Sequence, residues 1–325
     1  MRAILLVPAG FASTPSGGNV YDRHVRAGLL GLGWELETHE LAPGDPLPAV
    51  PAGAVVLADS LVVSWSARGL LAMDAVVVPL VHTPFETPGE RELLSAAPAV
   101  LVTSDWTRRW LVEHYRLASD RVHVAEPGVE MADRVSGTQG GGELLCVGTV
   151  TLAKGQDVLL AALARLTDLD WRCTLVGRLD RDPDFVDELH KAASDAGIAD
   201  RLAILGALGH DDVAAAYAGA DVLVHPSRSE TYGMVVTEAL ARGLPVIASS
   251  VGGVPEALGR AEDDSVPGLL VRPDSPEALA RSLRRWLEEP RRRARLRRSA
   301  GSRRLTLRAW SQTTSRVAGV LEGVS

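Results

Sequence analysis

Cysteine and lysine are both scarce in this chain of 325 residues. The two cysteines, Cys146 and Cys173, each lie in an apolar, strand-like run, so we expect buried thiols rather than a disulfide framework or a zinc site. Of 34 basic residues only Lys154 and Lys191 are lysines, which we attribute to a coding bias towards arginine. This bias makes Lys154 stand out.

Long apolar runs are also missing. No run reaches the roughly 18 residues that a membrane-spanning helix needs, and the N-terminal MRAILLVPAG is typical of a short strand rather than a signal peptide. We therefore expect a cytoplasmic protein, with peripheral contact at the inner membrane face left open.

The chain lacks the excess of positive charge that is typical of nucleic-acid binders, because its formal net charge is −7. One segment is an exception: Arg281 to Arg308 holds twelve arginines against Glu288 and Glu289, a net charge of +10, which leaves −17 for the rest. Two interpretations stay open for this arginine cluster. It is a solvated helix face with partners four residues away, or a surface for anionic lipid headgroups.

The length favours two domains, and apolar strand candidates alternate with amphipathic helix candidates throughout, as in α/β proteins with parallel sheets. The helices are expected near residues 155–166, 187–197, 211–220 and 233–243. The glycine-rich segment 136–142 has no apolar anchor, and we expect it to be the linker between two Rossmann-like domains. The expected strands lie near residues 2–10, 34–41, 54–60, 75–86, 99–105, 121–129, 143–150, 173–177, 201–208, 221–227, 244–250 and 268–273.

The most informative stretch follows the strand that ends at His225. Gly233 opens a helix there, and the unpaired N–H groups of Gly233, Met234 and Val235 predict an anion site suited to a phosphate or pyrophosphate. Glu230 lies just before this N-terminus, and Glu238 lies about 7 Å further along the helix axis. Carboxylates accept hydrogen bonds from paired sugar hydroxyls, so two of them around a phosphate site suit a nucleotide sugar. The alternative is that one glutamate is a cap-region charge and the other a solvated helix charge.

The same stretch supports a resemblance to a known family. It reads P-S-x-x-E-x-Y-G-x-x-x-x-E-A-x-A-x-G-x-P-V-I-A, followed by GGVPE. This composite resembles the donor site of retaining glycosyltransferases of family 4, which have the GT-B fold. The resemblance implies that Glu230 contacts hydroxyls of the donor sugar, that Glu238 holds the ribose, and that residues 252–256 form a nearby loop. It also places Tyr232, Gly233, Met234 and Val235 in the donor site, with the amides of Gly233 and Met234 at the diphosphate.

Upstream, CVGTVTLAKGQDVLLAAL resembles the family segment in which an arginine and a lysine hold the diphosphate. The lysine is present as Lys154, but the arginine is replaced by Thr149. Either Arg178 or Arg228 substitutes for it, or Thr149 acts through its hydroxyl and water, or catalysis is impaired. A further resemblance, in RLAILGAL, implies that the backbone near Leu205 and Gly206 holds the base.

The first half carries weaker marks of the same family. Gly17 and Gly18 resemble its glycine-rich loop, which allows close approach to a phosphate or acceptor before a helix that we expect near Asn19. The loop lacks the G-x-G-x-x-G fingerprint, which argues against a nicotinamide-dependent enzyme. His82, in the H-x-P sequence at a strand end, is expected to face the ligand crevice, where the resemblance places it near the transferred sugar or its phosphate. We interpret His225 as a strand-end residue.

The resemblance as a whole implies a retaining glycosyltransferase of GT-B fold, with Glu230, His82 and Lys154 as its catalytic residues. Its two Rossmann-like domains, residues 1–138 on the acceptor side and 139–305 on the donor side, would face each other across a cleft. A last helix in residues 306–325 would cross back to the first domain, docked through Trp310.

The partners that this reading predicts are a nucleotide sugar, with UDP or GDP as the expected nucleotide, and an acceptor that is a small molecule, a glycan or a lipid. No Asp-x-Asp pair stands where a metal-bound diphosphate would require one, so no metal or other cofactor is expected. A non-catalytic nucleotide-sugar binder and a nucleotide-sugar epimerase on the same fold remain the alternatives.

Overall fold

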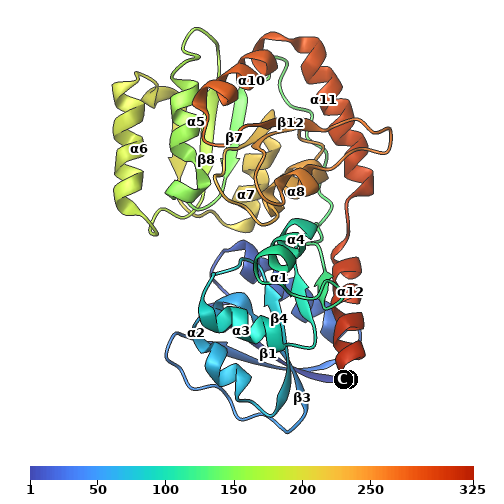
Figure 1. Ribbon diagram of the computed structural model, residues 1–325. Helices are drawn as coiled ribbons and strands as arrows, with labels where there is room; N and C mark the ends of the chain where they lie inside the picture. Colours follow the sequence, from blue (N-terminus) through green and yellow to red (C-terminus); the bar gives the residue numbers. More distant parts are fainter. The chain divides into compact units, whose positions relative to one another are not determined.

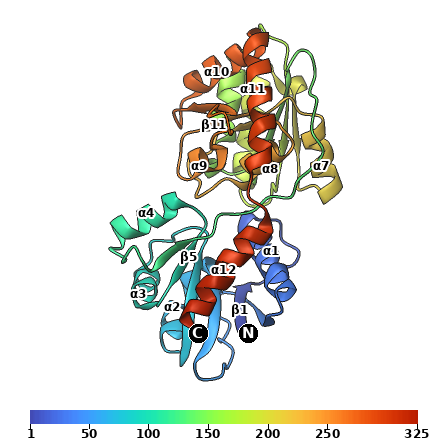
Figure 2. The same ribbon diagram turned by 90° about the vertical axis from the view of Figure 1, so that its right-hand side faces the viewer.

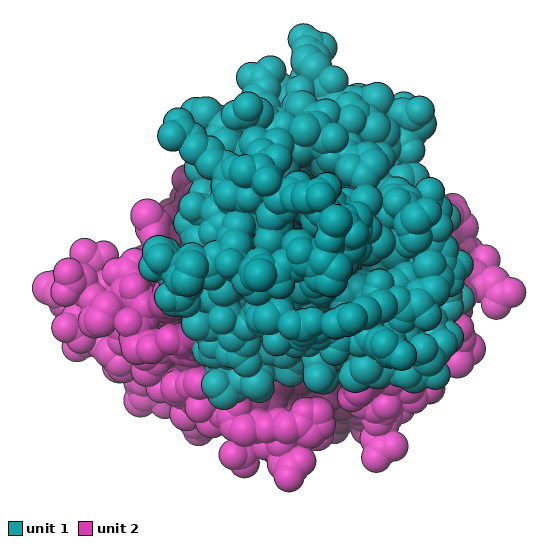
Figure 3. Space-filling view, turned by 90° about the horizontal axis from the view of Figure 1, so that it is seen from below, with its two compact units in different colours: residues 1–128, 308–325 teal, residues 129–307 magenta.

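The computed structural model describes residues 1–325 and divides them into two compact units, which are coloured separately in Figure 3. Unit 1 comprises Met1–Gly128 and Arg308–Ser325, and unit 2 comprises Val129–Leu307. Each unit is a parallel six-stranded sheet covered by helices on both faces. No helix is both long and apolar enough to cross a membrane.

Unit 1 has the strand order β2-β1-β3-β4-β5-β6. Because the order reverses between β1 and β3, the loops that follow these two strands flank the switch point at which α/β sheets bind ligands. The strands are β1 (Arg2–Pro8), β2 (Glu35–Leu41), β3 (Ala54–Asp59), β4 (Ala75–Val81), β5 (Val100–Val102) and β6 (Val122–Val124). The helices are α1 (Gly17–Gly31), α2 (Ser60–Leu71), α3 (Pro88–Ala96), α4 (Asp105–His114) and α12 (Trp310–Val324).

Helix α12 is the last helix of the chain, and it packs beside α1 in unit 1 (Figure 2). Val317 and Leu321 of α12 join Val25 and Leu29 of α1 in the core on one face of the sheet, while α2, α3 and α4 cover the other face. Trp310 stacks on the ring of His24 at 4.1 Å. The apolar stripe of the last helix is therefore buried within unit 1.

Unit 2 has the order β12-β11-β10-β7-β8-β9, which is the order of a dinucleotide-binding sheet, with its switch point between β7 and β10. All the runs predicted as strands in both halves form strands. Those of unit 2 are β7 (Glu143–Val147), β8 (Arg172–Val176), β9 (Leu202–Leu205), β10 (Val222–His225), β11 (Val246–Ser249) and β12 (Gly268–Val271). The helices are α5 (Gln156–Leu163), α6 (Pro183–Asp195), α7 (His210–Ala218), α8 (Met234–Ala241), α9 (Val254–Leu258), α10 (Pro276–Glu288) and α11 (Pro290–Arg303).

The alternation of side chains along β7 divides the core of unit 2 into two layers. Leu144 and Cys146 face the layer formed with α5, α6 and α10, whereas Leu145 faces the layer formed with α7, α8 and α9. Figure 1 shows α10 beside α5, and the two helices are in contact. Cys146 and Cys173 are free, buried thiols of the first layer, as the sequence predicts.

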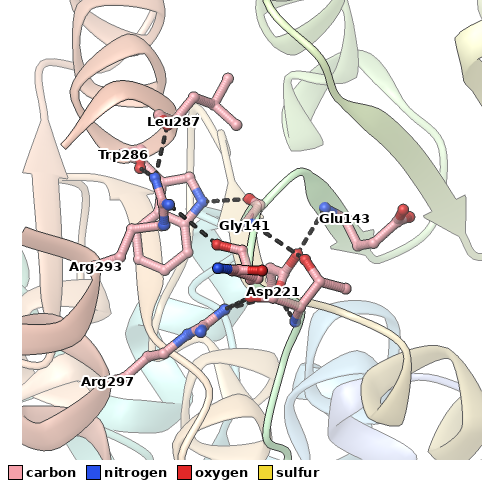
Figure 4. Close-up of polar contacts among 9 residues, drawn as sticks. Gly141, Glu143, Asp221, Trp286, Leu287, Arg293 and Arg297 are labelled. Carbon is pink, nitrogen blue, oxygen red and sulfur yellow. Dashed lines mark hydrogen bonds and ion pairs between the residues drawn. The ribbon is translucent and has the colours of Figure 1, made fainter. Parts of the chain in front are cut away.

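The glycine-rich segment 136–142 does not separate the two units, which corrects our prediction of a linker there. The units divide between Gly128 and Val129, and the segment packs inside unit 2. Its backbone is held by Asp221, Arg293 and Arg297 (Figure 4). A run of glycines without apolar side chains looks flexible, but distant polar side chains satisfy its peptide groups here.

Asp221 is the centre of this contact and is fully buried. Its carboxylate accepts hydrogen bonds from the hydroxyl of Thr138 at 2.6 Å, from the amide of Glu143 at 3.0 Å and from Arg297 at 2.7 Å (Figure 4). One carboxylate thus joins the glycine-rich segment, β7 and α11.

Replacing Asp221 by alanine should lower the free energy of unfolding by about 3 kcal/mol, because several donors lose their acceptor at once. Denaturant unfolding followed by circular dichroism measures this value. The matched control is Asp187→Ala on the exposed face of α6, which should change it by less than about 0.5 kcal/mol. Equal changes in the free energy of unfolding of the two variants would show that the buried Asp221 contributes no more to stability than an exposed aspartate.

Candidate functional site

Lys154 and Glu230, predicted from separate motifs, lie together in unit 2. Lys154 follows β7 and Glu230 follows β10, so both lie at the carboxyl ends of the strands that flank the switch point. Nζ of Lys154 donates a hydrogen bond to Oε2 of Glu230 at 2.6 Å. The two loops are joined by their backbones, since the amide of Arg228 donates to the carbonyl of Ala153 at 2.9 Å.

Glu230 is ionised in this environment. Burial on its own raises the pKa of Glu230, but the ammonium of Lys154 and the ring of His225 outweigh burial and lower the pKa to about 2. Nε2 of His225 lies 3.3 Å from Oε2 of Glu230, and the His225 side chain is only 3% exposed. His225 is thus a strand-end residue that contacts the carboxylate, a contact that the sequence did not predict.

The N-terminus of α8 lies directly after Glu230. The N-cap residue Gly233 has a φ of 96°, which favours glycine, and the helix begins at Met234. The amide groups of Gly233, Met234 and Val235 have no acceptor within the protein. Because these N–H groups lie at the positive end of a helix, they form the anion-binding arrangement that the sequence predicts.

The glycine pair that follows β11 fixes the shape of the Glu230 loop. The amide of Gly253 donates to the carbonyl of Glu230 at 3.1 Å. A Cβ atom on Gly252 would lie 1.6 Å from that same carbonyl oxygen, so only glycine fits there. The predicted nearby loop, residues 252–256, is therefore a support for the Glu230 loop, and it leads into α9.

Glu238 lies on α8 but is not a solvated charge on an open helix face. The hydroxyl of Tyr217, on α7, donates to Oε2 of Glu238 at 2.9 Å. Arg242 lies over the Tyr217 ring, with 4.5 Å between the guanidinium carbon and the ring centroid. Burial raises the pKa of Glu238 above its ordinary value, although the Tyr217 hydrogen bond and the Arg242 charge both lower it.

The position of the family's missing arginine is occupied by Thr149, which follows β7 and Gly148. Its carbonyl accepts a hydrogen bond from the buried side chain of Gln156 at 3.1 Å. The two proposed substitutes are already paired with carboxylates. Arg228 binds both oxygens of Asp157 at 2.7 Å, and Arg178 binds Asp180.

The remaining residues predicted for the donor site have more local roles in the structure. Leu205 ends β9 with an exposed side chain, and the carbonyls of Leu205 and Gly206 both accept the amide of Gly177, at 3.4 and 3.3 Å. Tyr232 is largely buried among the apolar side chains of α8 and α9. Any contact of Tyr232 with a ligand is therefore limited to a small exposed part of its ring.

In unit 1, His82 and the glycine-rich loop are neighbours. A Cβ atom on Gly18 would lie 3.2 Å from Cδ2 of His82, so the loop backbone lies close to the imidazole. Helix α1 begins at Gly17, two residues earlier than predicted, because the side chain of Ser16 caps it by accepting the amide of Asn19.

Sequence reasoning missed the two carboxylates that contact His82. Nε2 of His82 lies 2.8 Å from Oδ1 of Asp22, on α1, and 3.3 Å from Oδ2 of Asp59, at the end of β3. Both carboxylates are almost completely buried. Burial raises the pKa of Asp59, and the nearby Asp22 raises it further, against the opposing effect of His82. The position of Asp59 at a strand end was the one signal in the sequence that pointed here.

Asp22, Asp59 and His82 are also the one group of three acidic or imidazole side chains whose ligand atoms all lie within 4.8 Å of one another. The 2.8 Å between Nε2 of His82 and Oδ1 of Asp22 is an ordinary hydrogen-bond distance. The contact is thus accounted for by a hydrogen bond.

Many side chains of the arginine cluster bind partners within the protein and are not available to an external ligand. Arg293 is buried and donates to carbonyls of Trp286 and Leu287, while Arg304 donates to those of Ala241 and Ala132. Further members with partners inside the protein are Arg284, Arg292, Arg297, Arg303 and Arg308. Those exposed without a protein partner are Arg281, Arg285, Arg291, Arg295 and Arg298. Much of the positive charge therefore has a structural role in unit 2.

The fold is shared with solved structures that match the whole chain. The sucrose-phosphate synthase of Thermosynechococcus elongatus matches with a TM-score of 0.83 and 21% identity, covering 99% of both chains. HepE of Anabaena, solved in complex with UDP-glucose, matches with a TM-score of 0.81 and 18% identity over 99% of this chain and 100% of that one. The architecture of this chain is thus the GT-B fold.

A model of the family described as glycosyl transferases group 1 matches residues 133–303. A D-inositol 3-phosphate glycosyltransferase of Catenulispora acidiphila is 33% identical over 258 residues, which is 73% of this chain and 60% of that protein. A protein of the same name from Xylanimonas cellulosilytica is 31% identical, over 76% of this chain and 67% of the relative. The chain belongs to the group 1 glycosyl transferases, and it spans about three fifths of the length of the first relative.

Proposed function

We propose that the protein is a retaining glycosyltransferase of family 4 that transfers a sugar from a nucleoside diphosphate sugar to an acceptor. UDP and GDP are the expected nucleotides, and the acceptor is a small molecule, a glycan or a lipid. Glu230 orients the sugar, Lys154 and the N-terminal amides of α8 hold the diphosphate, and Glu238 holds the ribose. His82 is proposed to contact the transferred sugar or its phosphate.

One observation carries this proposal. The ammonium of Lys154 lies 2.6 Å from Glu230. Glu230 precedes the N-terminus of α8, where three amides have no acceptor within the protein. Both residues lie at the switch point of a sheet with dinucleotide-binding strand order. A cation and aligned amides stabilise a leaving diphosphate, and the adjacent ionised carboxylate accepts hydrogen bonds from sugar hydroxyls. The UDP-glucose complex of HepE and the names of the relatives support the same chemistry.

Thermal unfolding with UDP, GDP, ADP, dTDP and NAD tests the donor class. A ligand at a hundred times its Kd stabilises the folded state by about 2.7 kcal/mol, which is a shift of several degrees. A shift with one nucleoside diphosphate, followed by release of that nucleotide from its sugar conjugates when candidate acceptors are added, supports the proposal. A shift with NAD alone, or with none of the five, contradicts it.

We further propose that no divalent ion takes part, because Lys154 and the α8 amides supply positive charge at the diphosphate. The diphosphate itself can accept the proton of the acceptor as the sugar bond breaks, so the reaction needs no separate base. Turnover should be unchanged in excess chelator. Loss of turnover in chelator, restored by Mg²⁺ or Mn²⁺, would contradict this part of the mechanism.

Replacing Glu238 by alanine should weaken the binding of the nucleoside diphosphate about 10- to 100-fold, since the ribose hydroxyls lose their carboxyl acceptor. Titration calorimetry with the nucleotide selected above measures the loss. Tyr217→Phe is the control, because it keeps the carboxylate and removes only the hydroxyl that holds it, so its effect should be smaller. An unchanged Kd in Glu238→Ala would remove the ribose assignment.

A non-catalytic nucleotide-sugar binder is the second candidate. It is favoured by Thr149, since both arginines that could replace the missing one are paired with carboxylates. Such a protein would bind a nucleotide sugar and release no nucleotide with any acceptor. An epimerase would instead convert the bound sugar with no acceptor present, which analysis of the sugar product distinguishes.

We also propose that the protein contacts anionic membranes through the five exposed arginines, three of which, Arg291, Arg295 and Arg298, follow one another at helical spacing along α11. Sedimentation with vesicles of anionic lipid tests this contact. Equal sedimentation with neutral vesicles, or with the three arginines replaced by glutamine, would contradict it.

A further inference from the structure

His82 is held by buried acidic side chains on one side of its ring. Asp22 and Asp59 come from α1 and from the end of β3, and their side chains are 0% and 3% exposed, whereas that of His82 is 14% exposed. Both carboxylates approach the same nitrogen, Nε2. The other nitrogen, Nδ1, makes no hydrogen bond within the protein, which leaves it available to a ligand.

The two carboxyl groups differ in their partners. Asp59 also accepts the amide of Leu61 and so caps α2. Oδ1 of Asp22 lies at hydrogen-bond distance from His82, whereas its second oxygen, Oδ2, is buried without a hydrogen-bond partner. A buried carboxylate is costly unless it is paired with a charge, so the position of Asp22 is explained by a charged imidazole. The charge of Asp22 also raises the pKa of the adjacent buried Asp59.

No other charged group contributes to the surroundings of His82. Tyr21 of α1 contacts the imidazole with its ring edge, at 5.1 Å between centroids, but its hydroxyl donates to the carbonyl of Ala125. The groups that act on His82 are therefore Asp22 and Asp59.

We propose that Asp22 is a positioning residue for His82: it fixes the imidazole through Nε2 and keeps the ring protonated, so that Nδ1–H is presented as a charged donor. The inference rests on the proposed function, in which His82 contacts the transferred sugar or its phosphate. Asp22 itself does not touch the substrate in this scheme.

The charge on His82 sets the direction of the pH dependence. Burial lowers the pKa of His82, but the charge and hydrogen bond of Asp22 and the charge of Asp59 outweigh burial and raise the pKa above its ordinary value. The imidazolium is present below this raised pKa and is lost as the pH rises through it. The charged donor at Nδ1 is therefore present below the raised pKa of His82 and is lost on its alkaline side.

An NMR titration of the full chain labelled with ¹⁵N-histidine tests the proposal directly, with the His82→Gln variant used to assign the signal. In the wild-type chain, the midpoint of His82 should lie above about 6.5, the value of a free histidine. In Asp22→Asn, which keeps an oxygen at the position of Oδ1 and removes the charge, the midpoint should fall by about one pH unit or more.

Asp74→Asn is the matched control, because it makes the same charge change at an exposed site of unit 1, and it should leave the midpoint unchanged. A wild-type midpoint at or below 6.5 would overturn the proposal even if Asp22→Asn failed to fold. An unchanged midpoint in a folded Asp22→Asn chain would also overturn it. So would tight binding of Zn²⁺ or Mn²⁺ by the wild-type chain that Asp22→Asn abolishes, since the group would then be a metal site.

Turnover as a function of pH separates positioning from a merely structural role. If Asp22 keeps His82 charged, the alkaline limb of the profile should move to lower pH by about one unit in Asp22→Asn, and Asp74→Asn should match the wild type. A purely structural loss lowers the rate at every pH and leaves the limb in place. The NMR midpoint needs no substrate, so this inference can fail or hold independently of the proposed transferase activity.

Discussion

Replacing Glu230 by glutamine should lower turnover about 100-fold or more and leave the affinity for the nucleoside diphosphate unchanged or higher. The carboxylate loses its charge, and with it the strong acceptor for sugar hydroxyls, an interaction that matters most when the sugar is oriented in the transition state. Glu230 also neutralises Lys154 at 2.6 Å. A diphosphate has to compete with this pair, and glutamine removes the competitor.

Single-turnover rates with the nucleotide sugar and calorimetry with the free nucleotide measure the two quantities separately. Glu262→Gln, at an exposed position of unit 2, is the control for the loss of one negative charge, and both quantities should stay at their wild-type values. If the nucleotide affinity of Glu230→Gln fell as much as its turnover, Glu230 would hold the nucleotide, and its role would have to be exchanged with that of Glu238.

The local geometry of the candidate site in unit 2 could be predicted from the sequence because its residues belong to local patterns. A strand, a polar loop and a helix N-terminus follow one another from Val222 to Ala241, so the free amides of α8 and the positions of both glutamates depend on neighbouring residues alone. The contact between Lys154 and Glu230 needs the strand order as well. It arises because β7 and β10 are neighbours at the switch point.

The features that the sequence did not predict depend on contacts between residues that are distant in the chain. In the sequence, Asp22 resembles any polar residue of an amphipathic helix. In the structure, the strand order β1-β3-β4 places it next to Asp59 and His82. The glycine-rich segment 136–142 is held by Asp221, which lies far along the chain and whose burial no local pattern indicates. Both cases are buried charges, and a buried charge is specified by its partners rather than by its own sequence neighbours.

Replacing Lys154 by alanine should lower turnover by a factor of about 100 to 1,000 and weaken diphosphate binding about tenfold or more, since the ammonium neutralises the leaving group. Lys191→Ala is a closely matched control, because Lys191 is the other lysine of the chain and lies exposed on α6, paired with Asp195. It should behave as the wild type. Equal losses in the two variants would show that a general loss of charge, rather than the position of Lys154, is responsible.

The double variant Lys154→Ala, Glu230→Gln completes a cycle that tests whether the two residues act together. Removing Lys154 alone leaves the buried carboxylate of Glu230 with the His225 ring as its remaining partner, so part of the loss in Lys154→Ala comes from an unneutralised charge next to the phosphates. Glutamine removes that charge. Nucleotide affinity should therefore be higher in the double variant than in Lys154→Ala, while turnover stays low in both. Strictly additive effects on affinity would mean that the 2.6 Å pair between Lys154 and Glu230 has no influence on diphosphate binding.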